Sequence, residues 1–284
     1  RRRASGLLPG ACPFAMMFAD ILFGITGACY AIATVMFVRY LFGEEIDKKP
    51  KWAPRLVTVG AVLHAIHIVV SSLVTHTCPV EGMHFALSVV SMLACAAYAV
   101  LRFRYPVDLV GTFVAPFALT FLFASRVVGM KDEPAKIGSI LPLHITANLL
   151  GDALFTLAFG AAVLYLLQEN RLKKKAFAGL SQKLPPLDSL DRAEHRFLLY
   201  GFPLLTIGIL TGTVFSRRVE FGSVADQTRA AFGYLTWIVF AAVLSLRAAA
   251  GWRGRKAAYG TITGFAIALL VLALYLWRSI QGAA

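Results

Sequence analysis

The sequence predicts an all-α, polytopic membrane helical bundle with about eight transmembrane helices. Of its 284 residues, 58% are hydrophobic and only 15% are charged, and the mean hydropathy is +0.70. Its apolar runs are too long for soluble core helices and approach the roughly 20 residues that cross a bilayer. A soluble globular chain is therefore excluded, and the lipid bilayer is the first expected partner.

Eight apolar segments follow one another along the chain, separated by charged or turn-forming residues. We expect membrane spans at 14–42, 57–74, 84–101, 107–125, 143–168, 198–216, 230–249 and 259–277. Together they form a single integral-membrane domain over residues 1–284. The segments contain no internal repeat, which argues mildly against inverted-repeat transporters.

Basic residues gather in alternate connections and predict the orientation of the bundle. The connections after the first, third, fifth and seventh spans hold 18 of the 28 Lys and Arg residues, so they are expected on the cytoplasmic side. Both termini then lie on the outer, periplasmic side of a bacterial cytoplasmic (inner) membrane. The basic residues are not interleaved with aromatic side chains on a continuous polar face. The net charge of +13 therefore indicates topology, and no nucleic-acid partner is expected.

The longest polar connection, residues 169–197, is interpreted as a cytoplasmic elbow. Its lysine-rich start suits the C-terminal end of the fifth helix. Pro185 and Pro186 stop any continuation, and Asp188 or Ser189 can cap a short amphipathic helix.

A polar stripe is predicted on the fifth span, where His144, Asn148 and Asp152 follow one another at four-residue steps. Polar side chains inside a membrane are expensive and require a bundle partner or a ligand. A neutral imidazole is a good ligand for haem iron. The alternative for His144 is a hydrogen bond to a neighbouring helix.

The second span carries His64 and His67 on nearly the same face, and each has the same two interpretations. Asp20 in the first span and Asp152 in the fifth are intramembrane acids. Either acid can pair with a span-two histidine, hold a proton or serve a proton path, and we favour the orientation of a histidine.

The outer connection SRRVEFGSVADQTRAA places Arg217, Arg218 and Arg229 against the usual charge bias. Arginine binds carboxylates well, and haem propionates are such carboxylates. Lipid headgroup contacts, or pairing with Glu220 and Asp226, are the alternative. A further open question is a disulfide between Cys12 and Cys78, which are both predicted outside the membrane.

The C-terminal half resembles a known family over residues 140–270. The segments that carry the resemblance are LHITANLLGDALFTLAFGAAVLYLLQENRLKKK, then TIGILTG, then TW followed by an arginine ahead of GWRGRKAA. The chain is similar to the cytochrome c assembly (CcsA/CcmC/ResC-type) superfamily, especially its HemX/YpjD-like branch. The resemblance implies a haem site at the outer face, with haem b as the expected cofactor.

Residue by residue, the resemblance assigns His144 to the family's first outward histidine and Asp226 to the acid that closes its tryptophan-rich loop. The tryptophans of that loop are missing, because Phe221, Gly222 and Ser223 stand where Trp-Gly-Ser would begin. The second outward histidine is missing too, and Ser245 falls where synthase-type members can carry a membrane histidine. In the HemX-like branch a histidine in the second span is common, and His64 occupies a comparable place.

We therefore predict a haem-binding accessory membrane protein, rather than an enzyme, that assists cytochrome c assembly or haem metabolism. In this hypothesis His144 and, as a second candidate, His64 bind the iron, while Asp226 with Arg217, Arg218 or Arg229 positions the propionates. Cytochrome c maturation, respiratory or haem-pathway proteins are the expected partners.

Two other functions remain open. One is a proton-coupled small-molecule transporter that uses Asp20, His64, His67 and Asp152 as a relay. The other is a membrane scaffold subunit of a larger complex, which would recruit partners through the basic elbow. No sequence motif for hydrolytic or kinase chemistry is present.

Overall fold

The computed structural model is a helical bundle, and it describes residues 13–43, 51–75, 83–103, 108–128, 141–175, 180–216 and 224–281. Its first half consists of α1 (Pro13–Phe42), α2 (Trp52–Thr75), α3 (Met83–Leu101), the short 3-10 turn η1 (Asp108–Val110) and α4 (Gly111–Val128). Its second half consists of α5 (Leu141–Lys173), the one-turn α6 (Leu180–Lys183), α7 (Leu187–Ser216), α8 (Val224–Ala250) and α9 (Arg255–Gln281).

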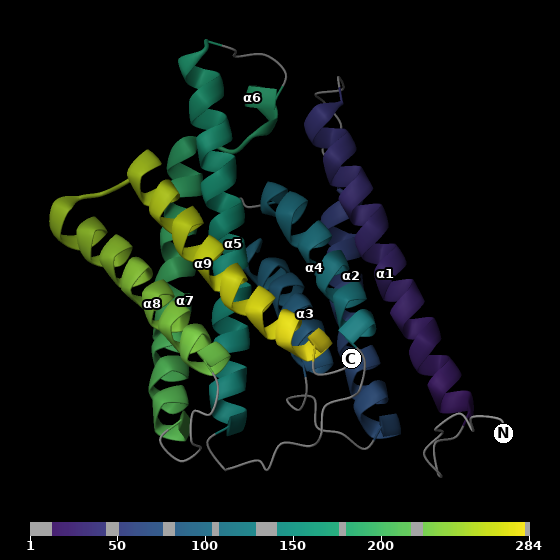
Figure 1. Cartoon of the computed structure of the whole chain (residues 1–284). Coiled ribbons are helices and arrows are strands. Elements are labelled where there is room, and N and C mark those ends of the chain that lie inside the picture. Colours follow the sequence, from purple (N-terminus) through teal and green to yellow (C-terminus); the bar gives the residue numbers. More distant parts are fainter. Residues whose placement is uncertain are drawn as a thin grey trace.

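Eight of the described helices are long and apolar enough to cross a membrane, so the predicted fold class of about eight membrane helices is confirmed. Seven of them contain the whole of one predicted span, whereas α4 begins at Gly111, inside the span predicted at 107–125. Figure 1 shows the start of α1 and the end of α9 at the same end of the bundle. Following the predicted orientation, we call this the outer end, and we call the opposite end, with Lys173 and Arg255, the inner end.

The helix α5 forms the centre of the bundle (Figure 1). It packs most extensively on α7 and also contacts α3, α4 and α9, whereas α1 and α8 lie at opposite edges. Small residues dominate the buried positions of its central turns, where Ala153, Ala158, Ala161 and Ala162 are fully covered. Small side chains let helix backbones approach closely, which is the usual basis of helix packing in membranes.

The elbow is shorter than the sequence suggested. The helix α5 continues to Lys173, and α7 begins at Leu187 and runs without interruption into the membrane span. The segment after Pro186 is therefore the first part of α7 and not a separate amphipathic helix. Lys183, at the end of α6, is 7% exposed and donates to the backbone carbonyl oxygens of Tyr40 (2.7 Å) and Gly43 (2.5 Å). A cation satisfies the carbonyls that a helix leaves open at its C-terminus, so this lysine attaches the elbow to α1.

Candidate functional site

The imidazole of His144 lies against α7 near the outer end of α5. Its Nδ1 is 2.8 Å from the backbone carbonyl oxygen of Gly208. Because a carbonyl oxygen can only accept a hydrogen bond, Nδ1 carries the proton and Nε2 keeps its lone pair in the neutral ring. The residue is partly exposed. This contact is a hydrogen bond to a neighbouring helix, the alternative that the sequence left open, and it leaves Nε2 as the ring nitrogen with a lone pair.

The TIGILTG segment of α7 provides the surface on which this ring rests. A Cβ at Gly212 would lie 2.6 Å from His144 Cε1, and a Cβ at Gly208 would collide with the side-chain amide of Asn148. Asn148 Nδ2 donates to the backbone carbonyl of His144 at 2.9 Å and lies 3.3 and 3.4 Å from the two ring nitrogens. The two glycines therefore create the space that His144 and Asn148 occupy.

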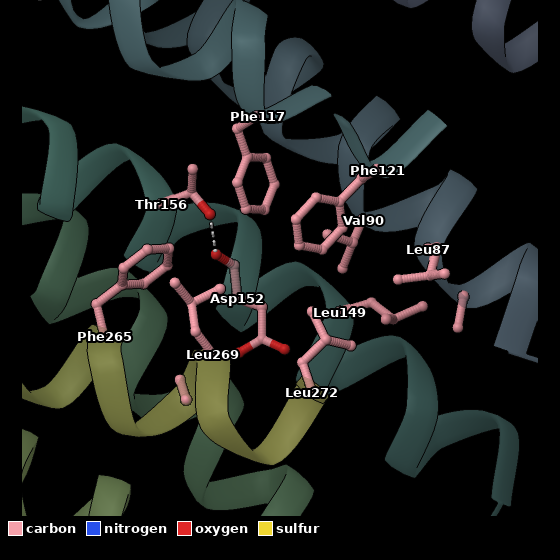
Figure 2. A pocket seen from close by; sticks show the side chains of 12 residues that line it. Leu87, Val90, Phe117, Phe121, Leu149, Asp152, Thr156, Phe265, Leu269 and Leu272 are labelled. Carbon is pink, nitrogen blue, oxygen red and sulfur yellow. Dashed lines mark hydrogen bonds between the residues drawn. The ribbon is translucent and has the colours of Figure 1, made fainter. Parts of the chain in front are cut away.

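Asp152 does not continue this contact. Each four-residue step along an α-helix advances by about 40°, so two steps carry Asp152 roughly 80° around α5 from His144. Its side chain lines a small cavity of about 40 Å³ between α3, α4, α5 and α9 (Figure 2). The predicted stripe is therefore divided. His144 and Asn148 face α7, whereas Asp152 faces α3, α4 and α9.

His64 sits in a closed polar network among α1, α2 and α3. Its Nδ1 is 3.2 Å from the hydroxyl of Tyr30, its Nε2 is 2.8 Å from the hydroxyl of Ser88, and the residue is 0% exposed. Both ring nitrogens therefore have hydroxyl partners. This arrangement is typical of a histidine that joins helices, the alternative left open by the sequence.

His67 and Asp20 lie near each other but are held by different groups. His67 Nδ1 is 3.0 Å from the backbone carbonyl of Ala19, and its ring meets Phe23 edge-on. The carboxylate of Asp20 forms an ion pair with Arg126 of α4. Asp20 is therefore bound to an arginine, and the structure does not connect it with Asp152 as the relay hypothesis required.

The structure also reveals a buried charged cluster at the inner end that was not among the predicted sites. Asp191 of α7 accepts hydrogen bonds from Arg247 Nη2 of α8 (2.5 Å) and from the backbone N–H of Gly254 (2.7 Å). Glu194 Oε1 accepts from Thr261 of α9 at 2.6 Å. Gly254 has a φ of 63°, a conformation that favours glycine.

The signal in the sequence was the arginine ahead of GWRG. This arginine, Arg247, belongs to the resemblance, and in the structure it joins α8 to Asp191 of α7, which also holds Gly254 of the α8–α9 turn.

Several predicted residues fall outside the described part of the chain. Arg217, Arg218, Cys12 and Cys78 lie outside the described residues. Asp226 and Arg229 belong to the first turns of α8, and their side chains are outside the described part. Among the residues that are described, no three His, Cys, Asp or Glu side chains gather into a metal-binding group.

Comparison with known proteins shows that residues 77–283 match the family model described as cytochrome C assembly protein. The match is wider than the resemblance at 140–270. Relatives include two proteins named cytochrome c biogenesis protein CcsA. The one from Guillardia theta is 27% identical over 190 residues, covering 59% of this chain and 63% of the relative. The one from Synechocystis sp. is 28% identical over 220 residues, covering 74% and 65%.

A shorter match reaches higher identity. The protein of the same name from Microcystis aeruginosa is 39% identical over 93 residues, covering 32% of this chain and 28% of that protein. In the two longer matches, the chain spans less than two thirds of the relatives' own length.

Proposed function

This chain belongs to the cytochrome c assembly protein family, and from that premise we propose that it handles haem at the outer end of its bundle and assists cytochrome c assembly. The family match includes the whole of α5 and α7, the two helices that hold His144. The observation that carries the proposal is the geometry of this histidine. Its Nδ1 is bonded to the carbonyl of Gly208, and its Nε2 is the nitrogen that can bind iron.

The fit of the residues to a haem group supports His144 more strongly than His64. His144 Nε2 would hold the iron of a bound haem through its lone pair. His144 is partly exposed, and the contact of its Nε2 with Asn148 Nδ2 is long, at 3.4 Å. Binding at His64, by contrast, requires a contact with Tyr30 or Ser88 to break, and the Ser88 contact is 2.8 Å. We therefore propose His144 as the first ligand and His64 as the weaker candidate.

The location proposed for haem is the outer surface beside His144. The cavity at Asp152, about 40 Å³, is too small for a macrocycle. Asp226, Arg217, Arg218 and Arg229 remain the residues proposed to position the propionates, because all four follow α7 in the outer connection or in the first turns of α8. Haem b is the proposed cofactor.

The multi-pass helical architecture supports action within a membrane. We propose the bacterial cytoplasmic membrane, with the haem site on its periplasmic side, because 18 of the 28 Lys and Arg residues belong to the connections after the first, third, fifth and seventh spans. Other proteins of cytochrome c maturation are the proposed partners. We propose an accessory role rather than catalysis, because this chain lacks the loop tryptophans of the synthase-type motif and has Ser245 where synthase-type members can carry a membrane histidine.

The test is haem binding by the full chain. We would express it with haem supplied, purify it in detergent, and measure the Soret absorbance per protein and the haem type as the pyridine haemochrome. We expect a b-type Soret band that is lost or strongly shifted in His144→Ala. His195→Ala is the matched control, because this histidine belongs to α7 near the inner end, and its band should be unchanged.

Two results would contradict the proposal. One is a wild-type protein without a Soret band, and the other is a band that His144→Ala leaves unaltered. Loss of the band in His64→Ala alone would transfer the ligand role to α2. Mass spectrometry of subunits that co-purify with the wild-type chain, and not with His144→Ala, would identify haem-dependent partners.

A further inference from the structure

The carboxyl group of Asp152 faces a small cavity in the outer half of the bundle. Figure 2 shows it beside Leu149, Leu269 and Leu272, with the rings of Phe117 and Phe121 across the space. The cavity volume is about 40 Å³, which is room for about two water molecules. The wall is otherwise apolar apart from one hydroxyl, that of Thr156.

No described side chain offers this carboxyl group a counter-charge. The hydroxyl of Thr156 donates to the backbone carbonyl of Asp152 itself, at 2.8 Å, so it leaves the carboxyl oxygens untouched but can accept a hydrogen bond. No hydrogen bond or ion pair joins the carboxyl group to another described residue.

The surrounding helices have few ionisable groups near this depth. From α3 and α4 the cavity is lined by Ala86, Leu87, Val90, Phe117 and Phe121, and from α9 by Phe265, Ala268, Leu269 and Leu272. The neighbouring titratable residue on α3 is His84, whose ring lies 4.3 Å from that of Phe85. On α5 itself the neighbour toward the outer end is His144, which faces α7. The α7 sequence has no ionisable residue between Tyr200 and Ser216.

An ionised carboxylate in this setting would lose its hydration without gaining a cation or hydrogen-bond donors. Asp152 is partly exposed, but it lies within a membrane span and its surroundings are apolar. A charge there is unfavourable, and a carboxyl group in such a place commonly avoids it by binding a proton. A protonated carboxyl group, by contrast, can donate one hydrogen bond and accept others. Water in the cavity would complete these bonds and could also reach the hydroxyl of Thr156.

We infer that Asp152 is an intramembrane proton-binding site, in which a protonated carboxyl group and Thr156 hold one or two water molecules between α5 and α9. The site is separate from the proposed haem contact, because Asp152 faces α3, α4 and α9 whereas His144 rests on α7. It also differs from the relay considered for the sequence, since Asp20 is paired with Arg126 and His64 with two hydroxyl groups.

The test is infrared spectroscopy of the full chain in lipid vesicles, with aspartate labelled by ¹³C in its carboxyl group. Only a protonated acid gives the high-frequency C=O stretch, and the label separates aspartate from glutamate. We expect a label-sensitive band at neutral pH in the wild type, its loss in Asp152→Asn, and a shift after transfer to D₂O. Glu194→Gln is the control, because Glu194 is an acid that is 0% exposed and its replacement would not alter a labelled aspartate band.

The wild-type measurement does not depend on whether any variant folds. Absence of a label-sensitive band at neutral pH would overturn proton binding by Asp152. A band that persists unchanged in folded Asp152→Asn would assign the proton to another aspartate and overturn it as well. A band that D₂O does not shift would overturn the presence of exchangeable water in the cavity.

Discussion

Replacing Asp191 with asparagine should destabilise the inner end of the bundle more than any change of an exposed charge. Asp191 and Arg247 are 10% and 7% exposed at their side chains. The asparagine amide can still accept the hydrogen bond from Gly254, because it keeps one carbonyl oxygen. The substitution therefore removes mainly the negative charge that compensates Arg247.

The magnitude follows from this burial. Breaking a buried ion pair by removing one partner costs about 3–5 kcal/mol, since the other charge remains without compensation. Arg247 keeps its hydrogen bond to the backbone carbonyl oxygen of Asp191, at 3.1 Å, after the side chain is changed. We therefore expect the lower end of the range, about 3 kcal/mol of unfolding free energy.

The assay is SDS titration in mixed micelles, followed by tryptophan fluorescence, which includes Trp252 in the α8–α9 turn. Asp188→Asn is the matched control on the same helix, because its pair with Arg192 is exposed at 72% and 60% and should change stability little. Asp191→Asn combined with Arg247→Met should recover most of the loss, because it removes the uncompensated charge and keeps an acceptor for Gly254. Equal stability of Asp191→Asn and wild type would refute the structural role given to this pair.

Two further changes test contacts elsewhere in the bundle. Gly212→Ala should displace His144, because its Cβ would lie 2.6 Å from the ring; we expect a cost of about 1–3 kcal/mol from overpacking and a weaker Soret band. A Cβ at Gly24 would meet only open space, so Gly24→Ala should preserve both the stability and the Soret band. If the two variants had the same stability and the same Soret band, the close contact between Gly212 and His144 would be refuted. Lys183→Met should lower the unfolding free energy by about 1–3 kcal/mol and expose the elbow to limited proteolysis. The side chain of Lys173 is 56% exposed, so Lys173→Met should change neither the unfolding free energy nor the cleavage of the elbow. Equal cleavage of the Lys183 and Lys173 variants would contradict the attachment of the elbow to α1.

The sequence was sufficient to predict the membrane helices, because the pattern that indicates a span lies in neighbouring residues. Each predicted span consists of neighbouring apolar residues, and the bilayer thickness determines how many are needed. Helix ends were harder to predict. The helix α7 begins at Leu187 because a helix can continue beyond the bilayer once its polar turns find partners. Asp191 finds such partners in Arg247 and Gly254, which lie far along the chain.

The candidate site was predictable only in part. The sequence indicated His144, and the TIGILTG motif was prominent, but nothing local connected the two. Their contact depends on the register between α5 and α7, which the glycines of α7 permit. His64 illustrates the opposite case. Its position within a span was evident, whereas its two hydroxyl partners come from α1 and α3 and could not be inferred from spacing.

The sequence by itself therefore determined that this protein is a membrane bundle of about eight helices, related to the cytochrome c assembly proteins, with few polar residues inside its spans. Hydropathy and motif order are properties of the chain and require no knowledge of packing. The tertiary structure alone decided which polar group meets which. It separated Asp152 from His144, joined Asp20 to Arg126, and left one nitrogen of His144 as the candidate haem ligand. The physical reason is that hydrogen bonds and ion pairs act over a few ångströms, and only the packing of helices brings distant residues that close.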